Sequence, residues 1–218
     1  DPYHIYVKAM AKYFGSNQTL DSKWYEKDKS KAEKNPHLYS QMWPILDEYQ
    51  KEAFQDLSNY AENWNGAFLC DGVGLGKTYT GLMLIEKFAL KDSKRVLLIS
   101  PKSVHDSVWV DKLETMLKHV PKDKIKAIKT TDLTNFDEDE IASFNDVEMI
   151  IIDEAHYFRN KKSQRYQRLQ KIIKTGMKKQ VFFLTATPLN NDVYDLYNMI
   201  SLFIERGEST FKNVGIHD

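Results

Sequence analysis

Short, continuous apolar runs alternate with longer amphipathic segments through most of the chain after residue 66. Continuous apolar runs are typical of strands that are covered on both faces, and their alternation with segments of helical length indicates the crossover units of a parallel sheet. The pattern predicts an α/β protein, built as a three-layer sandwich around a mostly parallel sheet. The expected strands are 67–70, 96–100, 149–152 and 181–184, with a weaker one at 125–130.

The segments between these runs predict helices. Apolar positions recur with helical spacing from Leu46 to Trp64, and the Asn65-Gly66 pair that follows is a typical stop signal. Further helices are expected to begin near Lys77, Val104, Ser163 and Asp192. The acidic run 137–140 has adjacent carboxylates on an irregular segment, which favours a solvated loop over a metal site.

The first 40 residues differ from the rest of the chain. A short apolar pattern within residues 1–20 predicts one helix, and the charged stretch 21–36 is expected to be a solvated linker or an exposed helix, with a boundary near Asn35 and Pro36. The sequence therefore predicts two parts: an N-terminal helix with a charged linker at 1–40, and a single lobe at 41–218.

Composition limits the possible function classes. Of 218 residues, 42% are hydrophobic and 28% charged, as in an ordinary globular protein, and 31 basic side chains balance 31 acidic ones. With no global basic field, any nucleic-acid site must be local. A single cysteine, Cys70, excludes an internal disulfide, and no segment has the length and apolarity of a membrane helix. We expect the cytoplasm, or the nucleus in a eukaryote, and a chain excised from a longer one.

A glycine-rich segment, DGVGLGKT at 71–78, follows the first predicted strand and opens a helix. Glycines let successive backbone N–H groups turn toward phosphate oxygens, and the helix N-terminus adds its positive end. Lys77 would then reach the outer phosphates, and the Thr78 hydroxyl would complete the coordination of Mg²⁺. Asp71 stands where the strict pattern has glycine, and a plain strand-to-helix turn is the alternative. The expected phosphate-binding residues are Gly72, Val73, Gly74, Leu75, Gly76, Lys77 and Thr78.

Two carboxylates, Asp153 and Glu154, directly follow the third apolar run. Ligands of α/β proteins gather at the carboxyl ends of the strands, which is where these side chains would lie. We expect Asp153 to hold Mg²⁺ through a water and Glu154 to orient and deprotonate the attacking water. Helix capping is the alternative for an isolated pair. Two pieces of phosphate chemistry in order along the chain favour the nucleotide site.

His156 follows these carboxylates and allows three interpretations: a metal ligand, a general base, or a polar link to a neighbouring strand. No second His or Cys lies at ligand spacing, which argues against zinc. The preferred partners for a link are Thr185 and Thr187, at the end of the last predicted strand.

Read together, the segments DGVGLGKT, DEAH and LTATP resemble the first motor lobe of superfamily-two helicases and translocases, a RecA-like P-loop NTPase lobe. Among these, the Swi/Snf-type translocases of double-stranded DNA are most similar, through VLLISPKSVHDSVW, DEAHYFRN and LTATPLNNDVYDLYNMISLF. The resemblance covers roughly Leu46 to Phe203. It implies that Gln50 reads the adenine edge of ATP, and that Lys102 and Ser103 contact the nucleic-acid backbone.

The resemblance also implies an activity. It indicates the ATP-binding and ATP-hydrolysing lobe of an ATP-dependent DNA translocase or helicase, with ATP and Mg²⁺ as cofactors and double-stranded DNA as partner. A second lobe of this kind would supply arginines to the ATP site, so these 218 residues alone should bind nucleotide weakly and hydrolyse it slowly. Two alternatives stay open at this point: an RNA-dependent motor of the same superfamily, and a nucleotide-gated binding module without efficient hydrolysis.

Overall fold

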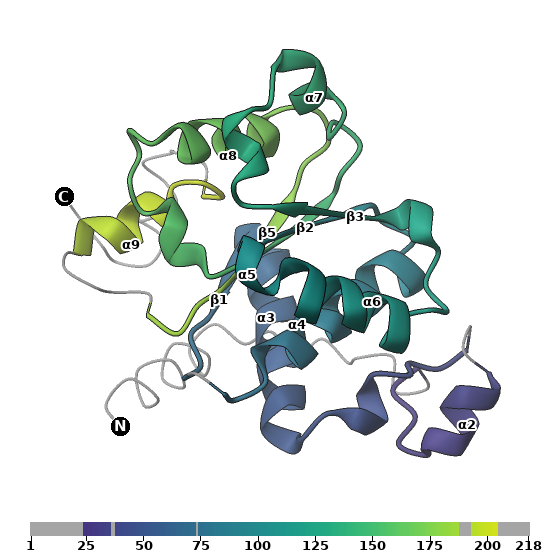
Figure 1. Ribbon diagram of the computed structural model, residues 1–218. Coiled ribbons are helices and arrows are strands. Elements are labelled where there is room, and N and C mark those ends of the chain that lie inside the picture. The colour runs from purple at the N-terminus through teal and green to yellow at the C-terminus, as the bar shows by residue number, and fades with distance from the viewer. Residues whose placement is uncertain (1–23, 36–37, 73, 188–192, 205–218) are drawn as a thin grey trace.

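Five parallel strands form the central sheet of the computed structural model, which describes residues 24–35, 38–72, 74–187 and 193–204 (Figure 1). The order is β1-β5-β4-β2-β3, and every neighbouring pair is parallel. The weaker apolar run becomes the edge strand β3, and the predicted parallel α/β sheet is confirmed. The strands are β1 Gly66–Leu69, β2 Val96–Ser100, β3 Ile125–Lys129, β4 Met149–Asp153 and β5 Gln180–Leu184.

Helices cover both faces of this sheet. The first face carries α3 (Glu48–Trp64), α4 (Lys77–Ile85) and α6 (Asp111–Met116), and the second carries α7 (Glu138–Ala142), α8 (Gln164–Lys174) and α9 (Val193–Ile200) (Figure 1). Successive strand residues point to opposite faces, so Leu98 and Ile151 pack into one apolar cluster while Leu97 and Ile150 pack into the other. The three-layer sandwich is therefore confirmed.

The predicted helix starts are close to the observed ones. Lys77 begins α4, and Ser163 caps α8, where its side chain accepts a hydrogen bond from the Tyr166 N–H. The helix expected near Val104 starts slightly earlier, with the short α5 (Lys102–Val104), and it continues to α6 through a wide π-helical turn at His105–Val110. Asp192 lies outside the described residues, and α9 begins at the next position. A second wide turn, Glu86–Lys91, extends α4.

The charged stretch before residue 36 contributes to the core. Trp24 and Tyr25 are buried, and the ring of Tyr25 lies 4.6 Å from Trp43 and 5.9 Å from Phe54, centroid to centroid. The expectation of a solvated linker is wrong for this aromatic pair, because burying large aromatic surfaces outweighs the charged character of the residues around them. The helix α2 (Lys29–Lys34) follows. Residues 1–20 lie outside the described part, and the division at residue 40 stays a prediction.

A buried carboxylate holds the segment before α3 against the helix that starts at Lys77. Glu86 is fully buried and accepts hydrogen bonds from the Ser40 hydroxyl, from Gln41 N at 2.7 Å and from Met42 N at 3.3 Å. His119 Nε2 lies 2.7 Å from the same carboxylate. Buried polar groups persist where they are hydrogen-bonded, and Glu86 meets this condition.

The acidic run 137–140 is exposed, but it is helical and not a loop. Asp137 caps α7, since its Oδ1 accepts from Glu140 N at 2.8 Å while the Glu140 carboxylate accepts from Asp137 N at 2.9 Å. This reciprocal cap satisfies two backbone donors of the first turn, which explains why the segment becomes a helix. Among the described residues, no helix is both long and apolar enough to cross a membrane.

Candidate nucleotide-binding site

The glycine-rich loop connects the carboxyl end of β1 to the first residue of α4. Gly74 and Gly76 adopt left-handed backbone conformations, with φ of 84° and 75°, which side chains with a Cβ rarely allow. At Gly76 an added Cβ would also lie 2.4 Å from Gln50 Nε2. The loop therefore needs glycine there both for its turn and for close contact with α3. Val73 lies outside the described residues.

The side chain of Lys77 folds back over this loop. Its ammonium donates to the carbonyl oxygens of Asp71 and Gly72, at 2.8 and 3.1 Å. Lys77 and Thr78 are the first two residues of α4, where unpaired backbone N–H groups and the positive end of the helix favour an anion. The described residues of the predicted loop thus surround a helix N-terminus, an arrangement that suits phosphate binding.

Gln50 belongs to the same structure, although it comes from the first turn of α3. Its side chain is only 5% exposed, its Oε1 accepts from Asp47 N at 3.1 Å, and its Nε2 lies 3.4 Å from Leu75 O. The Tyr49 hydroxyl donates to the same Leu75 oxygen at 2.7 Å. Helical periodicity alone does not indicate that either residue belongs to a site, but the fold places both against the glycine-rich loop. The adenine-reading role of Gln50 stays a prediction.

Asp153 and Glu154 stand at the carboxyl end of β4. Asp153 Oδ1 accepts from Glu154 N at 3.0 Å, and Asp153 Oδ2 accepts from the indole N–H of Trp109 at 2.8 Å. Burial raises the pKa of Asp153, and the indole hydrogen bond opposes that shift. Glu154 has a positive φ of 52°, which turns the chain sharply out of the strand. Sequence reasoning missed Trp109, because its partner lies 44 positions away.

The two motifs meet at one end of the sheet. β1 and β4 flank β5 and run in the same direction, so the loop after β1 and the acidic end of β4 project from the same edge. The positive charge of Lys77 is one of the influences that lower the pKa of Asp153, which agrees with this proximity. The structure thus brings the predicted phosphate loop and the predicted carboxylates together.

The donor chemistry of this edge suits Mg²⁺. No cluster of three or more His, Cys, Asp or Glu side chains that could hold a metal occurs among residues 24–35, 38–72, 74–187 and 193–204. Mg²⁺ is commonly held by one or two carboxylates, with phosphate oxygens and waters completing its shell. Asp153 and the Thr78 hydroxyl are hard oxygen donors of this kind, so they fit a metal that arrives with a nucleotide.

The predicted link from His156 to the threonines is not present as a hydrogen bond in the described part of the chain. His156 Nδ1 instead lies 3.1 Å from Glu154 Oε2, an ion-pair distance without hydrogen-bond geometry. Thr185 is buried, its N–H donates to Leu69 O at 3.0 Å, and its hydroxyl oxygen accepts from Thr187 N. A coupling role for His156, Thr185 and Thr187 stays a prediction.

Lys102 and Ser103, the predicted backbone contacts, begin the helical segment that ends at Met116. Both are exposed. Two residues further on, the buried His105 joins its Nδ1 to the Ser100 hydroxyl at 2.8 Å, which anchors the start of the helix to the end of β2. Lys102 and Ser103 are therefore held at the same sheet edge as Asp153, although no contact shown here tests their role.

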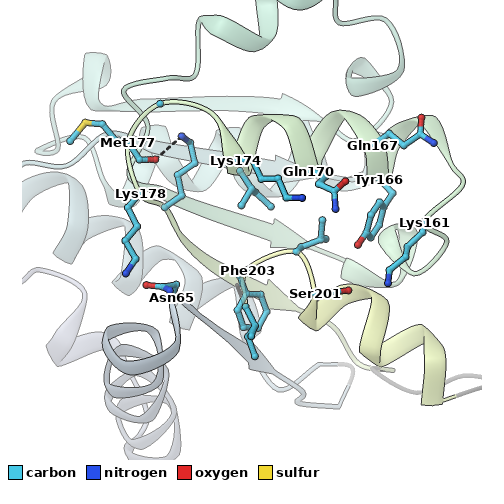
Figure 2. Close-up of a pocket in the computed structure, with 15 residues that line it drawn as sticks. Asn65, Lys161, Tyr166, Gln167, Gln170, Lys174, Met177, Lys178, Ser201 and Phe203 are labelled. Carbon is cyan, nitrogen blue, oxygen red and sulfur yellow. Dashed lines mark hydrogen bonds between the residues drawn. The ribbon is translucent and has the colours of Figure 1, made fainter. Parts of the chain in front are cut away.

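A sizeable cavity lies away from these residues. A pocket of about 790 Å³ opens between α8 and the end of α9 (Figure 2). It lies at the amino-terminal ends of the strands, where Asn65 and Lys179 precede β1 and β5. Lys161, Lys174 and Lys178 also line it. None of the predicted nucleotide-site residues lines this pocket, so the candidate site rests on the loop and the strand ends.

Comparison with known proteins identifies the family. The model of the family described as "Type III restriction enzyme, res subunit" matches residues 44–190. The chain belongs to this family. This family match, together with relatives described as a helicase and as SWI/SNF-related proteins, confirms the expectation of a first ATPase lobe of the superfamily-two type.

Individual relatives of this res-subunit family member are longer proteins. The "Uncharacterized ATP-dependent helicase YqhH" of Bacillus subtilis (strain 168) is 30% identical over 153 residues, which are 65% of this chain and 27% of that protein. The ISWI chromatin-remodeling complex ATPase ISW2 of Saccharomyces cerevisiae is 25% identical over 180 residues, which are 73% of this chain and 16% of that protein. The chain thus spans about a quarter or less of these two relatives.

A solved structure shares the fold. The SWI2/SNF2 ATPase core of Sulfolobus solfataricus, in complex with double-stranded DNA, matches with a TM-score of 0.60 at 22% identity. The match covers 72% of this chain and 35% of the solved chain. The predicted RecA-like fold is confirmed.

Proposed function

We propose that this res-subunit family member is the ATP-binding and ATP-hydrolysing lobe of an ATP-dependent DNA translocase or helicase. One observation carries the proposal: a glycine-rich loop at a helix N-terminus and a carboxylate pair share one edge of a parallel sheet. That edge provides donors for phosphate oxygens and acceptors for a metal and a water, which are the groups that phosphoryl transfer requires. Family membership supports the same conclusion.

The proposed roles follow from the position of each residue. Backbone N–H groups of the loop and the Lys77 ammonium bind the phosphates, which requires Lys77 to exchange its bonds to Asp71 O and Gly72 O for phosphate oxygens. Gln50 contacts the adenine edge. Thr78 and Asp153 hold Mg²⁺, which when bound neutralises charge on the phosphates. Glu154 orients the attacking water and accepts its proton.

Double-stranded DNA is the proposed partner, contacted through its phosphate backbone at Lys102 and Ser103. The net charge of zero requires such a local contact. The solved relative contains double-stranded DNA, which favours DNA over RNA as the proposed partner. The presence of both Asp153 and Glu154 favours hydrolysis over a module that only binds nucleotide. A second lobe that supplies arginines is part of the proposal, and its absence would cost about 10³–10⁵ in rate.

The nucleotide site is tested by Lys77→Ala. Calorimetric titration with Mg²⁺ and the non-hydrolysable ATP analogue AMPPNP should show affinity at least tenfold weaker than the unsubstituted chain, because the ammonium that meets the outer phosphates is gone. Lys118→Ala is the matched control, since Lys118 is an exposed lysine outside the loop. Equal affinity in the unsubstituted chain and Lys77→Ala would refute the proposed phosphate loop.

The hydrolytic role is tested by Glu154→Gln in the full-length protein. The amide cannot accept the water proton, so nucleotide binding should persist while turnover falls by about 10²–10⁴. Glu62→Gln, at an exposed position of α3, is the control. Undiminished ATP turnover in Glu154→Gln would remove this residue from the proposed base role.

A further inference from the structure

Trp109 makes a direct contact with the acidic end of β4 from a different element. It lies in the wide turn His105–Val110, between α5 and α6, and its side chain is fully buried. The indole Nε1–H donates to Asp153 Oδ2 at 2.8 Å. A buried indole normally has a hydrogen-bond partner. Here the partner is the carboxylate at the candidate metal position, and hydrogen bonds to a metal ligand affect how that ligand is oriented.

The indole is also fixed by packing against the helix that follows the phosphate loop. A Cβ added at Gly81 of α4 would lie 2.8 Å from Trp109 Cη2 and 3.2 Å from Leu184 Cδ1. Only a residue without a side chain leaves room at this position, so the ring lies close to the α4 backbone. Trp109 therefore contacts the helix that begins at Lys77, at Gly81, and also Asp153 at the end of β4.

The two hydrogen bonds to Asp153 determine how its carboxylate is oriented. Oδ1 accepts from the Glu154 backbone N–H at 3.0 Å, and Oδ2 accepts from the indole. A carboxylate has about four lone-pair positions, so one donor on each oxygen fixes the rotation of the group and leaves the other lone pairs available. The backbone donor belongs to the turn at Glu154 and is present whatever its side chain. The indole donor belongs to a side chain, so a substitution at Trp109 can remove it.

We propose that Trp109 is a positioning residue that orients the Asp153 carboxylate for Mg²⁺. The inference rests on the proposed nucleotide site and adds a residue to it. Hydrogen-bond partners of metal ligands typically contribute 10–100-fold in metal affinity, because they hold the ligand in its binding orientation. Through Trp109, the helical segment that begins at Lys102 becomes a support of the metal site.

The test separates the metal contribution from nucleotide affinity as such. The affinity of the 218-residue chain for AMPPNP is measured by calorimetry with Mg²⁺ and again with EDTA, and the ratio of the two dissociation constants is the gain due to Mg²⁺. Trp109→Phe keeps an aromatic ring but removes the N–H donor. We expect this variant to lose about 10–100-fold of the gain while its affinity in EDTA stays within about twofold of the unsubstituted chain.

Trp43→Phe is the matched control. Trp43 is also buried, but its indole nitrogen has no hydrogen-bond partner in the part of the chain that the structure describes. This variant loses the same atoms from a packed interior without losing a donor to a carboxylate, so its gain from Mg²⁺ should be unchanged. A similar loss of gain in both variants would show a packing effect and would overturn the proposal.

A second variant covers the case in which Trp109→Phe does not fold, as judged by circular dichroism. Site-specific incorporation of benzothienylalanine at position 109 preserves the bicyclic shape and places sulfur where the indole has its N–H. The same loss of the Mg²⁺ gain is expected, and an unchanged gain overturns the positioning role. If the unsubstituted chain does not bind AMPPNP at all, the proposed function itself fails, which is a distinct result from a variant that keeps the gain.

Discussion

Replacing Glu86 with alanine measures how strongly the segment before α3 is held against the helix that follows the phosphate loop. Glu86 is 0% exposed and accepts hydrogen bonds from Ser40, Gln41 and Met42, with His119 at 2.7 Å. Alanine leaves all of these groups buried without their shared acceptor. Each unsatisfied buried donor costs about 1–3 kcal/mol.

The full sum of these penalties will not be reached, because a cavity lined by polar groups can admit water. We therefore expect Glu86→Ala to lower the free energy of unfolding by part of that sum, about 3–5 kcal/mol. A typical domain is stable by about 5–15 kcal/mol, so the loss is a large fraction of the total. Glu86→Gln should also destabilise the protein, since the amide presents only one acceptor oxygen.

Urea unfolding followed by circular dichroism provides the measurement. With a slope of about 2–3 kcal/mol per molar urea, the midpoint should fall by about 1–2.5 M. Glu114→Ala, at an exposed position of α6, should stay within about 0.5 kcal/mol of the unsubstituted protein. A loss below about 1 kcal/mol in Glu86→Ala would refute the reasoning, because it would mean that the carboxylate is not the acceptor on which these donors depend.

Three further outcomes are expected. Gly176→Ala should destabilise the protein by at least about 2 kcal/mol in thermal unfolding, because φ is 73° and the new Cβ would lie 2.1 Å from Asn145 O; an unchanged melting temperature contradicts this. Gly76→Ala should weaken AMPPNP binding in calorimetry, since its Cβ would displace the Gln50 amide, and equal affinity speaks against that contact. Burial lowers the pKa of His105, so the folded state binds fewer protons than the unfolded state, and stability should fall as pH drops below about 6.5. His105→Gln should flatten this dependence in urea titrations, and an identical pH profile would exclude His105 as its cause.

The sheet and the two sequence motifs were predictable because both are local signals. A strand buried on both faces must be apolar along its whole length, which is why the run Met149–Ile152 stands out without any knowledge of its neighbours. The predicted phosphate loop carries glycine at fixed positions before a helix, and Gly74 and Gly76 adopt the left-handed conformations that glycine allows. The parallel arrangement then determines that both motifs lie at one edge.

Contacts between residues that lie far apart in the sequence were not predictable in the same way. Gln50, Trp109 and Glu86 act on partners that are far away in sequence, and their own neighbours suggest only ordinary helix positions. The burial of Trp24 and Tyr25 was not predictable from the local sequence either, because most of the residues that follow them are charged. Their partners, Trp43 and Phe54 among them, become visible only in the folded chain.

The aromatic packing of Trp24 and Tyr25 has a practical consequence for protein engineering. A truncation at residue 41, the predicted start of the lobe, would uncover the aromatic surfaces of Trp43 and Phe54 that Tyr25 now contacts. Contiguous exposed apolar surface of this kind promotes aggregation. Shortened or chimeric versions of this lobe should therefore keep every residue from Trp24 onward if they are to remain monodisperse.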